Sequence, residues 1–311
     1  MKHHTFETNG VAANIAVIVV SKGRPERLKQ LIPFLNAQTL TPSQLIIVVT
    51  EKSDADFDLD DLVDKNINAQ LAYAKPGTSH QRNIGISLTL PSTDYVVFFD
   101  DDFIPSKFAL EGIARGFAEF ADVNGMSGLV LADGITGKGI TLQEAESLIA
   151  SADQKRSADV PPNIVAHTAG LYGCNMAMRH SAIDGLEFDE RLPLYGWLED
   201  IDFAARMSGE KIETDAFWGV HLGAREGREV NGEILGYSQI VNNYYIYKKG
   251  TGRGLRLFRL GLRNFITNHV KSLRSEPWID RVARSRGNRI GLAHVFLGRA
   301  NPENILHWRD R

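Results

Sequence analysis

Tyr95-Val96-Val97-Phe98-Phe99-Asp100-Asp101-Asp102-Phe103-Ile104-Pro105 is an apolar run that ends in three adjacent carboxylates. A continuous apolar run is typical of a buried strand in a mainly parallel sheet, and open α/β sheets bind ligands beyond the carboxyl ends of their strands. Three neighbouring acids repel one another, and a divalent cation that prefers oxygen ligands, Mg²⁺ or Mn²⁺, offsets that cost. On this stretch alone, a solvated acidic turn or helix N-terminus is an equally good interpretation.

The residues before this stretch predict the neighbouring strands. Segments 15–20 and 45–49 are short β-branched runs, and a helix beginning near Pro25 is expected between them. A strand, a helix and a second strand within fifty residues form a parallel pair. A weaker strand is expected at 69–73, followed by a helix that ends near residue 90.

The residues after the triplet predict the rest of an α/β fold. We expect a helix over 106–121 capped by Ser106, a strand at 128–131 and another at 173–179. Residues 133–163 are glycine-rich and then charged, so we expect an insertion or mobile segment over one edge of the site. The predicted sheet is mixed but mostly parallel, Rossmann-like, and flanked by helices.

Three polar residues in the second half of the chain are candidates for chemistry. Glu199 and Asp200 stand at the expected start of a helix, where the helix dipole favours ionised carboxylates. A carboxylate held ionised beside a metal site can act as a general base, although helix capping alone also explains acids at this position. His221 lies at an expected strand end, where it is either a metal ligand or a structural histidine.

The composition bounds the class of protein. The chain has 311 residues, of which 43% are hydrophobic and 23% charged, as in ordinary globular proteins. Its single cysteine, Cys174, excludes a disulfide framework and a cysteine-based zinc site, and suits a reducing cytosol. Neither a membrane span nor a signal peptide is recognisable. We therefore expect a cytoplasmic protein, at most peripheral at the inner face of a membrane.

The C-terminal sixty residues are basic although the whole chain has a net charge of −3. Residues 251–311 contain 13 Lys and Arg but only 4 Asp and Glu. The first expected helix has apolar residues on one face and arginines on another: Leu255, Phe258, Leu262, Phe265 and Ile266 against Arg256, Arg259 and Arg263. Such an amphipathic helix either docks on the acidic body or lies at a membrane surface, and we expect no nucleic-acid partner.

Five motifs between about residues 15 and 249 together resemble the family 2 glycosyltransferases, which have the GT-A fold and use nucleotide sugars. They are Arg24-Pro25 with Gln38-Thr39 and Pro42; Gln81-Arg82-Asn83-Ile84-Gly85, similar to Ala-Arg-Asn-x-Gly; Asp100-Asp101-Asp102, similar to D-x-D; Gly173-Cys174-Asn175-Met176-Ala177-Met178-Arg179 with Phe188-Asp189-Glu190-Arg191-Leu192; and Gly196-Trp197-Leu198-Glu199-Asp200-Ile201-Asp202-Phe203, similar to G-x-x-E-D-x-D.

The resemblance implies a metal-dependent, inverting transfer of a sugar to a glycan or lipid-linked acceptor. It implies that Asp102 ligates Mn²⁺ or Mg²⁺ at the donor diphosphate, that His221 completes the metal site, and that Asp200 is the catalytic base. The remaining implied contacts are Ser21, Glu51, Arg82, Asp100 and Asp101 on the donor side and Trp197 and Glu199 on the acceptor side. Relatives often have an aspartate pair after the second strand, one of which holds the nucleobase, where this chain has Thr50-Glu51-Lys52. Glu51 can accept a hydrogen bond from a base N–H as aspartate does, but its longer side chain leaves the identity of the base open: a UDP-sugar is the leading donor, and dTDP- and GDP-sugars are the alternatives.

The resemblance also implies the domain organisation. Residues 1–250 are expected to form the glycosyltransferase domain, with a donor-binding half over about 1–132 and an acceptor half over about 164–250. Residues 251–311 are expected to form a basic helical tail. A sugar-nucleotide nucleotidyltransferase is a second hypothesis, although the loop after the first strand, 21–25, is poor in the glycine that cradles a triphosphate. A non-catalytic nucleotide- or glycan-binding module is the third.

Overall fold

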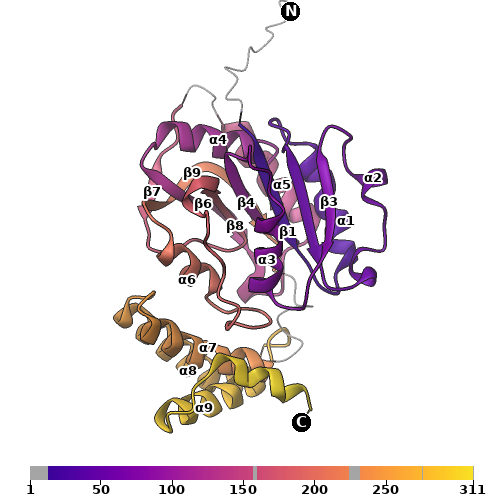
Figure 1. The fold of residues 1–311 in the computed structure, drawn as a ribbon. Helices are drawn as coiled ribbons and strands as arrows, with labels where there is room; N and C mark the ends of the chain where they lie inside the picture. The colour runs from indigo at the N-terminus through magenta and orange to yellow at the C-terminus, as the bar shows by residue number, and fades with distance from the viewer. Residues whose placement is uncertain (1–12, 157–159, 224–231, 275, 311) are drawn as a thin grey trace, which may run out of the picture.

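The computed structural model describes residues 13–156, 160–223, 232–274 and 276–310. A nine-stranded mixed sheet has the order β3-β2-β1-β4-β8-β6-β9-β5, and β7 pairs with β9. Figure 1 shows this sheet flanked by helices, with the C-terminal helices gathered beneath it. The predicted α/β fold class with a C-terminal helical extension is confirmed.

The first half of the sheet is parallel. Its elements are β1 Ile15–Val20, α1 Pro25–Asn36, β2 Gln44–Val49, η1 Lys52–Ala55, α2 Leu59–Leu62, β3 Asn68–Tyr73, α3 Thr78–Ser87 and β4 Tyr95–Asp100. Strands β1 and β4 pair from Ile15 opposite Tyr95 to Val20 opposite Asp100. Because parallel strands end at the same edge, the residues that follow β1 and β4 emerge side by side.

The second half makes the sheet mixed. Its elements are β5 Phe103–Pro105, α4 Ala109–Glu119, β6 Val123–Asp133, η2 Gly134–Thr136, α5 Leu142–Lys155, β7 Ile164–His167, β8 Asn175–Arg179, η3 His180–Ala182, α6 Glu199–Arg206 and β9 Glu210–His221. Strand β8 is antiparallel to both β4 and β6. The short β5 is antiparallel to the end of β9, with Phe103 opposite His221. This pairing brings His221 next to the carboxylate triplet.

The central strands are apolar without interruption because both of their faces are covered. Successive side chains of a strand point to opposite faces. Val17 and Val19 pack with residues of α1 and α4 on one face, whereas Ile18 packs with residues of α3 and α6 on the other. The triplet therefore follows a strand that is held from two sides.

Residues 133–163, expected to form an insertion or mobile segment, contain the 14-residue helix α5. Its first turn is closed by a capping box between Thr141 and Glu144. Ala145 and Ile149 are buried against β5 and β9. The helix is therefore part of the core packing. The glycine and charge content of the segment gave no indication of this buried helix.

Helix α4 begins at Ala109, three residues later than expected. Ser106, expected as its cap, accepts a 3.1 Å hydrogen bond from the N–H of Phe108 and donates a 2.6 Å bond to Asp153 at the end of α5. Ser106 therefore links α5 to the turn after β5. A capping pattern in the sequence does not predict such a tertiary contact.

The C-terminal helices form a compact layer below the sheet (Figure 1). They are α7 Gly232–Lys249, α8 Gly254–Ser272, α9 Arg281–Phe296 and η4 Pro302–Asp310. Buried Asn268 of α8 donates hydrogen bonds to Gln239 of α7 and Asn288 of α9. None of the helices in the described part of the chain has the length and apolar content needed to cross a bilayer.

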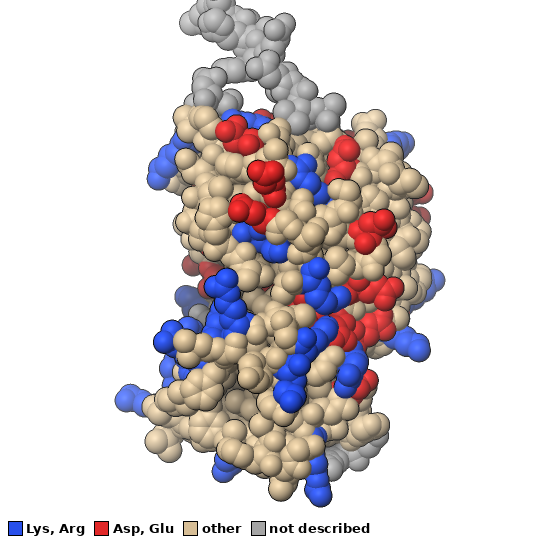
Figure 2. Space-filling view, turned by 60° about the vertical axis from the view of Figure 1, so that its left-hand side comes forward, with Lys and Arg blue, Asp and Glu red and all other residues tan. Residues whose placement is uncertain are grey.

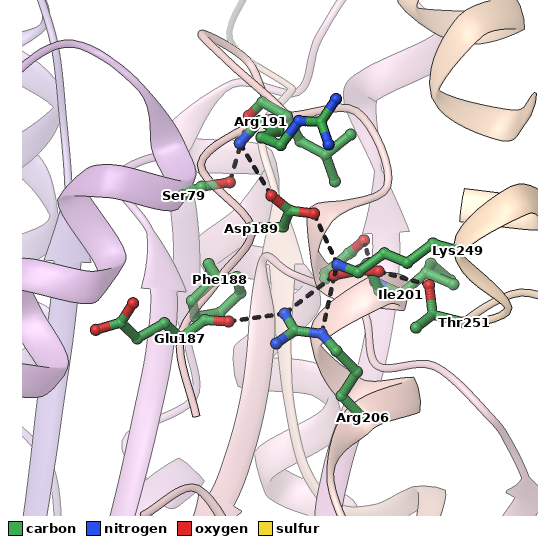
Figure 3. A network of polar contacts seen from close by, with 12 residues as sticks. Ser79, Glu187, Phe188, Asp189, Arg191, Ile201, Arg206, Lys249 and Thr251 are labelled. Carbon is green, nitrogen blue, oxygen red and sulfur yellow. Dashed lines mark hydrogen bonds and ion pairs between the residues drawn. The ribbon is translucent and has the colours of Figure 1, made fainter. Parts of the chain in front are cut away.

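Charged side chains fasten this layer to α6 (Figure 3). Lys249 Nζ at the end of α7 lies 2.7 Å from Asp189 and 2.8 Å from Asp202, which is fully buried. Asp202 also accepts a 2.5 Å hydrogen bond from Thr251 and forms an i,i+4 ion pair with Arg206. Because a buried carboxylate needs several partners, this network fixes α6 relative to the helices beneath it.

Helices α7 and α9 approach each other closely at Gly287. A Cβ added to Gly287 of α9 would lie 2.0 Å from the carbonyl oxygen of Glu233 in α7, whereas the nearest atoms to a Cβ on Gly261 of α8 would be the side-chain nitrogen of Asn243 at 3.3 Å and the carbonyl oxygen of Gln239 at 3.9 Å. We expect Gly287→Ala to lower the free energy of unfolding by about 2 kcal/mol, since overpacking forces backbone shifts. Gly261→Ala is the matched control and should be close to neutral, because alanine favours the helix.

Urea denaturation followed by circular dichroism measures both variants. Equal stability of the Gly287→Ala and Gly261→Ala proteins would contradict the close approach of α7 and α9.

Candidate active site

The three carboxylates of the triplet point in two directions. Asp101 is buried, accepts a 2.5 Å hydrogen bond from Ser21 Oγ, and lies 2.9 Å from the guanidinium of Arg24. Asp100 and Asp102 instead lie together beside the end of β9. One carboxylate thus anchors the loop after β1, and the other two lie in a group with His221.

Asp100, Asp102 and His221 form a group with ligand atoms that all lie within 4.8 Å of one another. His221 Nε2 is 3.3 Å from Asp102, and Nδ1 is 3.1 Å from Asp133. The hydroxyl of Tyr172 donates a 2.7 Å hydrogen bond to Asp133. A carboxylate on the second ring nitrogen fixes the tautomer and orientation of a metal-binding histidine, so this arrangement has the form of a supported metal site.

The electrostatics of this group favour a positive charge. Burial opposes a charge on His221, but its hydrogen bonds with Asp102 and Asp133 outweigh burial and raise its pKa to about 10. Carboxylate oxygens suit Mg²⁺ and Mn²⁺, and an imidazole ligand suits transition metals. The donor set therefore fits a divalent cation.

Arg82 of α3 joins the two sides of the site. Its side chain is 2% exposed, and the guanidinium lies 5.4 Å from the ring centroids of both Phe98 and Phe188. Nη2 donates to Asp100 at 3.1 Å and to the carbonyl of Gly173 at 3.0 Å, and Nη1 donates to Glu199 at 2.5 Å. A buried guanidinium requires paired acceptors, so Arg82 holds the end of β4 at a fixed place relative to the start of α6.

The residues on either side of Arg82 fasten other parts of the site. Gln81 donates hydrogen bonds to the carbonyl of Ser21, at the end of β1, and to the carbonyl at the end of β2. Asn83 donates to the carbonyl of Phe188 and accepts from its N–H. The residues of the motif that resembles Ala-Arg-Asn-x-Gly thus hold several segments around the cavity through hydrogen bonds.

Asp200 is held by backbone N–H groups at the N-terminus of α6. Its two oxygens accept from Gly173 at 2.9 Å and from Ile201 at 2.7 Å. Burial raises the pKa of Asp200, against the attraction of Arg82 and these hydrogen bonds. Burial also raises the pKa of Glu199 to about 8, with the charge of Asp200 adding to the rise and Arg82 opposing it. Both carboxylates therefore have a higher proton affinity than exposed acids.

The loop before α6 is strained and clamped. Leu194 and Leu198 have φ angles of 58° and 72°, in the left-handed region that costs a non-glycine residue roughly 1–2 kcal/mol. The N–H of Thr78 donates to the carbonyl of Leu194, and buried Asn242 of α7 donates to the carbonyl of Trp197. The surrounding contacts thus maintain the conformation that places Glu199 and Asp200.

These groups border a cavity of about 1000 Å³. The candidate residues from the sequence that line it are Ser21, Arg82, Asp100, Trp197, Glu199, Asp200 and His221. Asp101 and Asp102 adjoin this wall through Ser21 and His221. The candidate metal-binding group of Asp100, Asp102 and His221 and the candidate base Asp200 therefore lie at the same cavity.

The turn after β2 is organised by Asp54. This carboxylate is 1% exposed and accepts hydrogen bonds from the N–H groups of Gly23 at 2.6 Å and Thr50 at 2.9 Å. Glu51 is exposed, caps the short helix η1, and is not among the residues that line the cavity. A nucleobase contact for Glu51 stays a prediction.

No protein-family model matches the sequence, and no curated protein sequence matches it. The comparison with solved structures finds crystal structures of TarS from S. aureus. TarS 1–349 in complex with UDP-GlcNAc matches this chain with a TM-score of 0.52 and 13% sequence identity. The complex of TarS 1–349 with UDP matches with a TM-score of 0.51 and 12% sequence identity. Each match covers 92% of this chain and 92% of the TarS chain. A longer TarS structure gives 0.50 and 13% over 85% of this chain and 46% of that one, so this chain spans about half of its length.

At these identities the likeness is one of fold. The chain has a GT-A-type fold.

Sequence reasoning missed several residues of this site. Asp133 and Tyr172 support His221, and Arg256 of α8 lines the cavity. Asp133 carries the same signal as Asp100, an acid directly after an apolar strand, and that signal would have found it. Tyr172 and Arg256 have no such signal, because their places depend on how the loop before β8 and the helix α8 pack.

The linking role of Arg82 can be measured as a coupling free energy. We expect Arg82→Met to lower the free energy of unfolding by about 3 kcal/mol, because Asp100 and Glu199 lose their buried partner. In a Glu199→Gln background the same substitution should cost at least about 1 kcal/mol less, since the contact between Arg82 and the Glu199 carboxyl is already gone. Urea denaturation of the four proteins gives the cycle, and equal costs in both backgrounds would contradict the link.

Proposed function

We propose that this protein transfers a sugar from a nucleoside-diphosphate sugar to a hydroxyl group of a glycan or lipid-linked acceptor, with inversion at the anomeric carbon. The observation that carries the proposal is the meeting of the Asp100–Asp102–His221 group and Asp200 in one cavity of a GT-A-type fold. TarS, whose fold is similar, binds UDP-GlcNAc and UDP in its crystal structures, which supports a UDP-sugar as donor.

The donor diphosphate belongs beside Asp102 and His221 in this proposal. These two residues, with Asp100 next to them, would hold Mn²⁺ or Mg²⁺. When bound there, such a cation neutralises the negative charge on the leaving nucleoside diphosphate. Asp133 keeps the ring of His221 in place, so only Nε2 is directed at the cation.

The other donor contacts follow from position. Ser21 lines the cavity at the end of β1 and is fixed by its hydrogen bond to Asp101, so both residues shape the wall that receives the nucleotide. Arg82 is too deeply buried to follow a ligand, and it acts by holding Asp100 at the cavity. Glu51 does not line the cavity, so its proposed role as the nucleobase acceptor rests on the sequence resemblance alone.

Asp200 is the proposed catalytic base. Its carboxylate removes the proton of the acceptor hydroxyl while that oxygen forms a bond to the anomeric carbon. The bond between this carbon and the diphosphate oxygen breaks, and the electron pair leaves with the nucleoside diphosphate. Because burial raises the pKa of Asp200, its carboxylate is a stronger base than an exposed aspartate.

Glu199 and Trp197 are proposed to shape the acceptor side. Glu199 pairs with Arg82, which leaves Asp200 as the neighbouring carboxylate available to a substrate proton. Trp197 lines the same cavity next to the base, where an aromatic face can pack against a sugar ring. Glu199 therefore serves as a positioning residue.

The alternative of a nucleotidyltransferase requires free backbone N–H groups in the loop after β1, where a triphosphate would bind. In this loop the N–H of Ser21 donates to the carbonyl of Val48, and the N–H of Gly23 donates to Asp54. Two of the donors are thus committed to the protein itself, which favours the transferase over this alternative.

The metal site can be tested by nucleotide binding. We expect UDP to raise the melting temperature only when Mn²⁺ is present, with GDP and dTDP giving smaller shifts. Asp102→Asn should abolish the metal-dependent shift, because a neutral amide is a weaker ligand, whereas Asp184→Asn on an exposed turn should retain it. Thermal-shift measurements on the three proteins decide this, and an unchanged shift in Asp102→Asn would refute the assignment.

The base assignment has its own test. Asp200→Asn should lower the rate of sugar transfer by about 100-fold or more, since the amide does not accept the acceptor proton, while metal-dependent UDP binding stays close to that of the wild type. Product formation from a labelled UDP-sugar measures the rate. Full transfer by Asp200→Asn would exclude Asp200 as the base, and nucleotide binding by the wild type without any donor hydrolysis would favour a non-catalytic module.

A further inference from the structure

Helix α8 docks on the protein through a face different from its apolar face. Leu257, Gly261 and Asn268 are the buried residues of this helix, and they contact α7 and α9. Gly261 presents no side chain to α7, and Asn268 contributes a polar one. The docked face is therefore narrow and partly polar.

The apolar face of α8 points outward. It consists of side chains spaced three or four residues apart, which we call the α8 stripe: Leu255 (63% exposed), Phe258 (66%), Leu262 (45%), Ile266 (51%), Val270 (62%) and Leu273 (89%). Single exposed apolar residues are common on protein surfaces, but a continuous row along one helix marks an interaction site. The stripe runs the length of α8.

Basic residues border the stripe along one side. Arg256, Arg259 and Arg263 lie on the adjacent face by helical spacing, with Arg274 beyond the helix end. The segment 254–272 contains no Asp or Glu. Figure 2 shows Lys and Arg side chains along the boundary between the sheet and the helical layer, with a mostly uncharged surface below them.

We propose that the α8 stripe binds the surface of an anionic lipid bilayer, with the arginines at the level of the head groups. An apolar face flanked by arginine is the pattern of a helix that lies in a membrane interface, and arginine can extend its charge to the head groups while its stem stays in apolar surroundings. The same helix is not suited to crossing the bilayer.

Charge decides between this partner and a second copy of the chain. A contact between two stripes would bring Arg259 and Arg263 of one copy close to those of the other, with no acid on either helix to neutralise them. An anionic surface instead attracts every one of these residues. A lipid bilayer is therefore the favoured occupant.

The position of Arg256 connects the stripe to the cavity. This residue belongs to the first turn of α8 and also lines the cavity that holds Asp200. A bilayer bound along the stripe would therefore lie near one edge of the cavity. The docking claim does not depend on the proposed transfer reaction, because it rests on the surface of α8 alone.

Vesicle co-sedimentation of the full-length protein tests the proposal. We expect binding to vesicles of phosphatidylcholine with phosphatidylglycerol and little binding to phosphatidylcholine alone. Phe258→Gln/Ile266→Gln should weaken binding at least about tenfold, since two apolar anchors are lost. Arg259→Gln/Arg263→Gln should weaken it by roughly 25-fold, at about fivefold for each charge.

Matched control variants distinguish binding through the α8 stripe from nonspecific binding of vesicles by exposed apolar side chains. Tyr73→Gln/Val165→Gln removes two equally exposed apolar side chains from β3 and β7, and this variant should bind vesicles as the wild type does. Metal-dependent UDP binding should be unchanged in all variants, so a failure of lipid binding is distinguishable from a failure of the proposed function. Equal vesicle binding by the stripe variants and the wild type, or no binding at all, would overturn the proposal. Sedimentation velocity showing a dimer that Phe258→Gln/Ile266→Gln dissociates would also overturn it, in favour of a second copy.

Discussion

The buried guanidinium of Arg82 is the contact on which the site depends. It lies against the rings of Phe98 and Phe188, which also contact each other, and pairs with Asp100 from β4 and Glu199 from α6. These acids are 99 residues apart in the chain, and each would be costly to bury without a positive partner. The ion pairs therefore do more than stabilise the core, because they set where the end of the central strand lies relative to the helix that carries Asp200.

The adjacent acids of this chain lie in different environments, and the two members of each pair have different interaction partners. Asp101 faces Ser21 and Arg24 inside the protein, whereas Asp102 faces His221. Glu199 is taken up by Arg82, whereas Asp200 is held only by backbone N–H groups within the cavity wall. In each pair, one acid has a cationic partner within the protein, and its neighbour is the residue that we propose to act on a ligand.

The sheet could be predicted from the sequence, but much of the support around the site could not. The strands were recognisable because burial on both faces leaves an unbroken apolar run, and Asp100 and Asp200 were recognisable because they follow strand and helix signals. The contact of Asp133 with His221 depends on the pairing of β6 with β9, which spans some eighty residues of intervening chain. Likewise, helical periodicity found the apolar face of α8 but not that the helix would pack through Gly261 and Asn268 and leave that face outside.

We propose that the nucleotide and its cation bind beside Asp102 and His221, at the cavity that His221 and Asp200 line. Diffraction from a crystal of the protein soaked with UDP and Mn²⁺, recorded near the manganese absorption edge, tests it most directly. We expect one anomalous peak in contact with Asp102 and His221, with the diphosphate of UDP beside it and Asp200 across the remaining space. A manganese peak at another acidic group, or UDP bound outside this cavity, would contradict it.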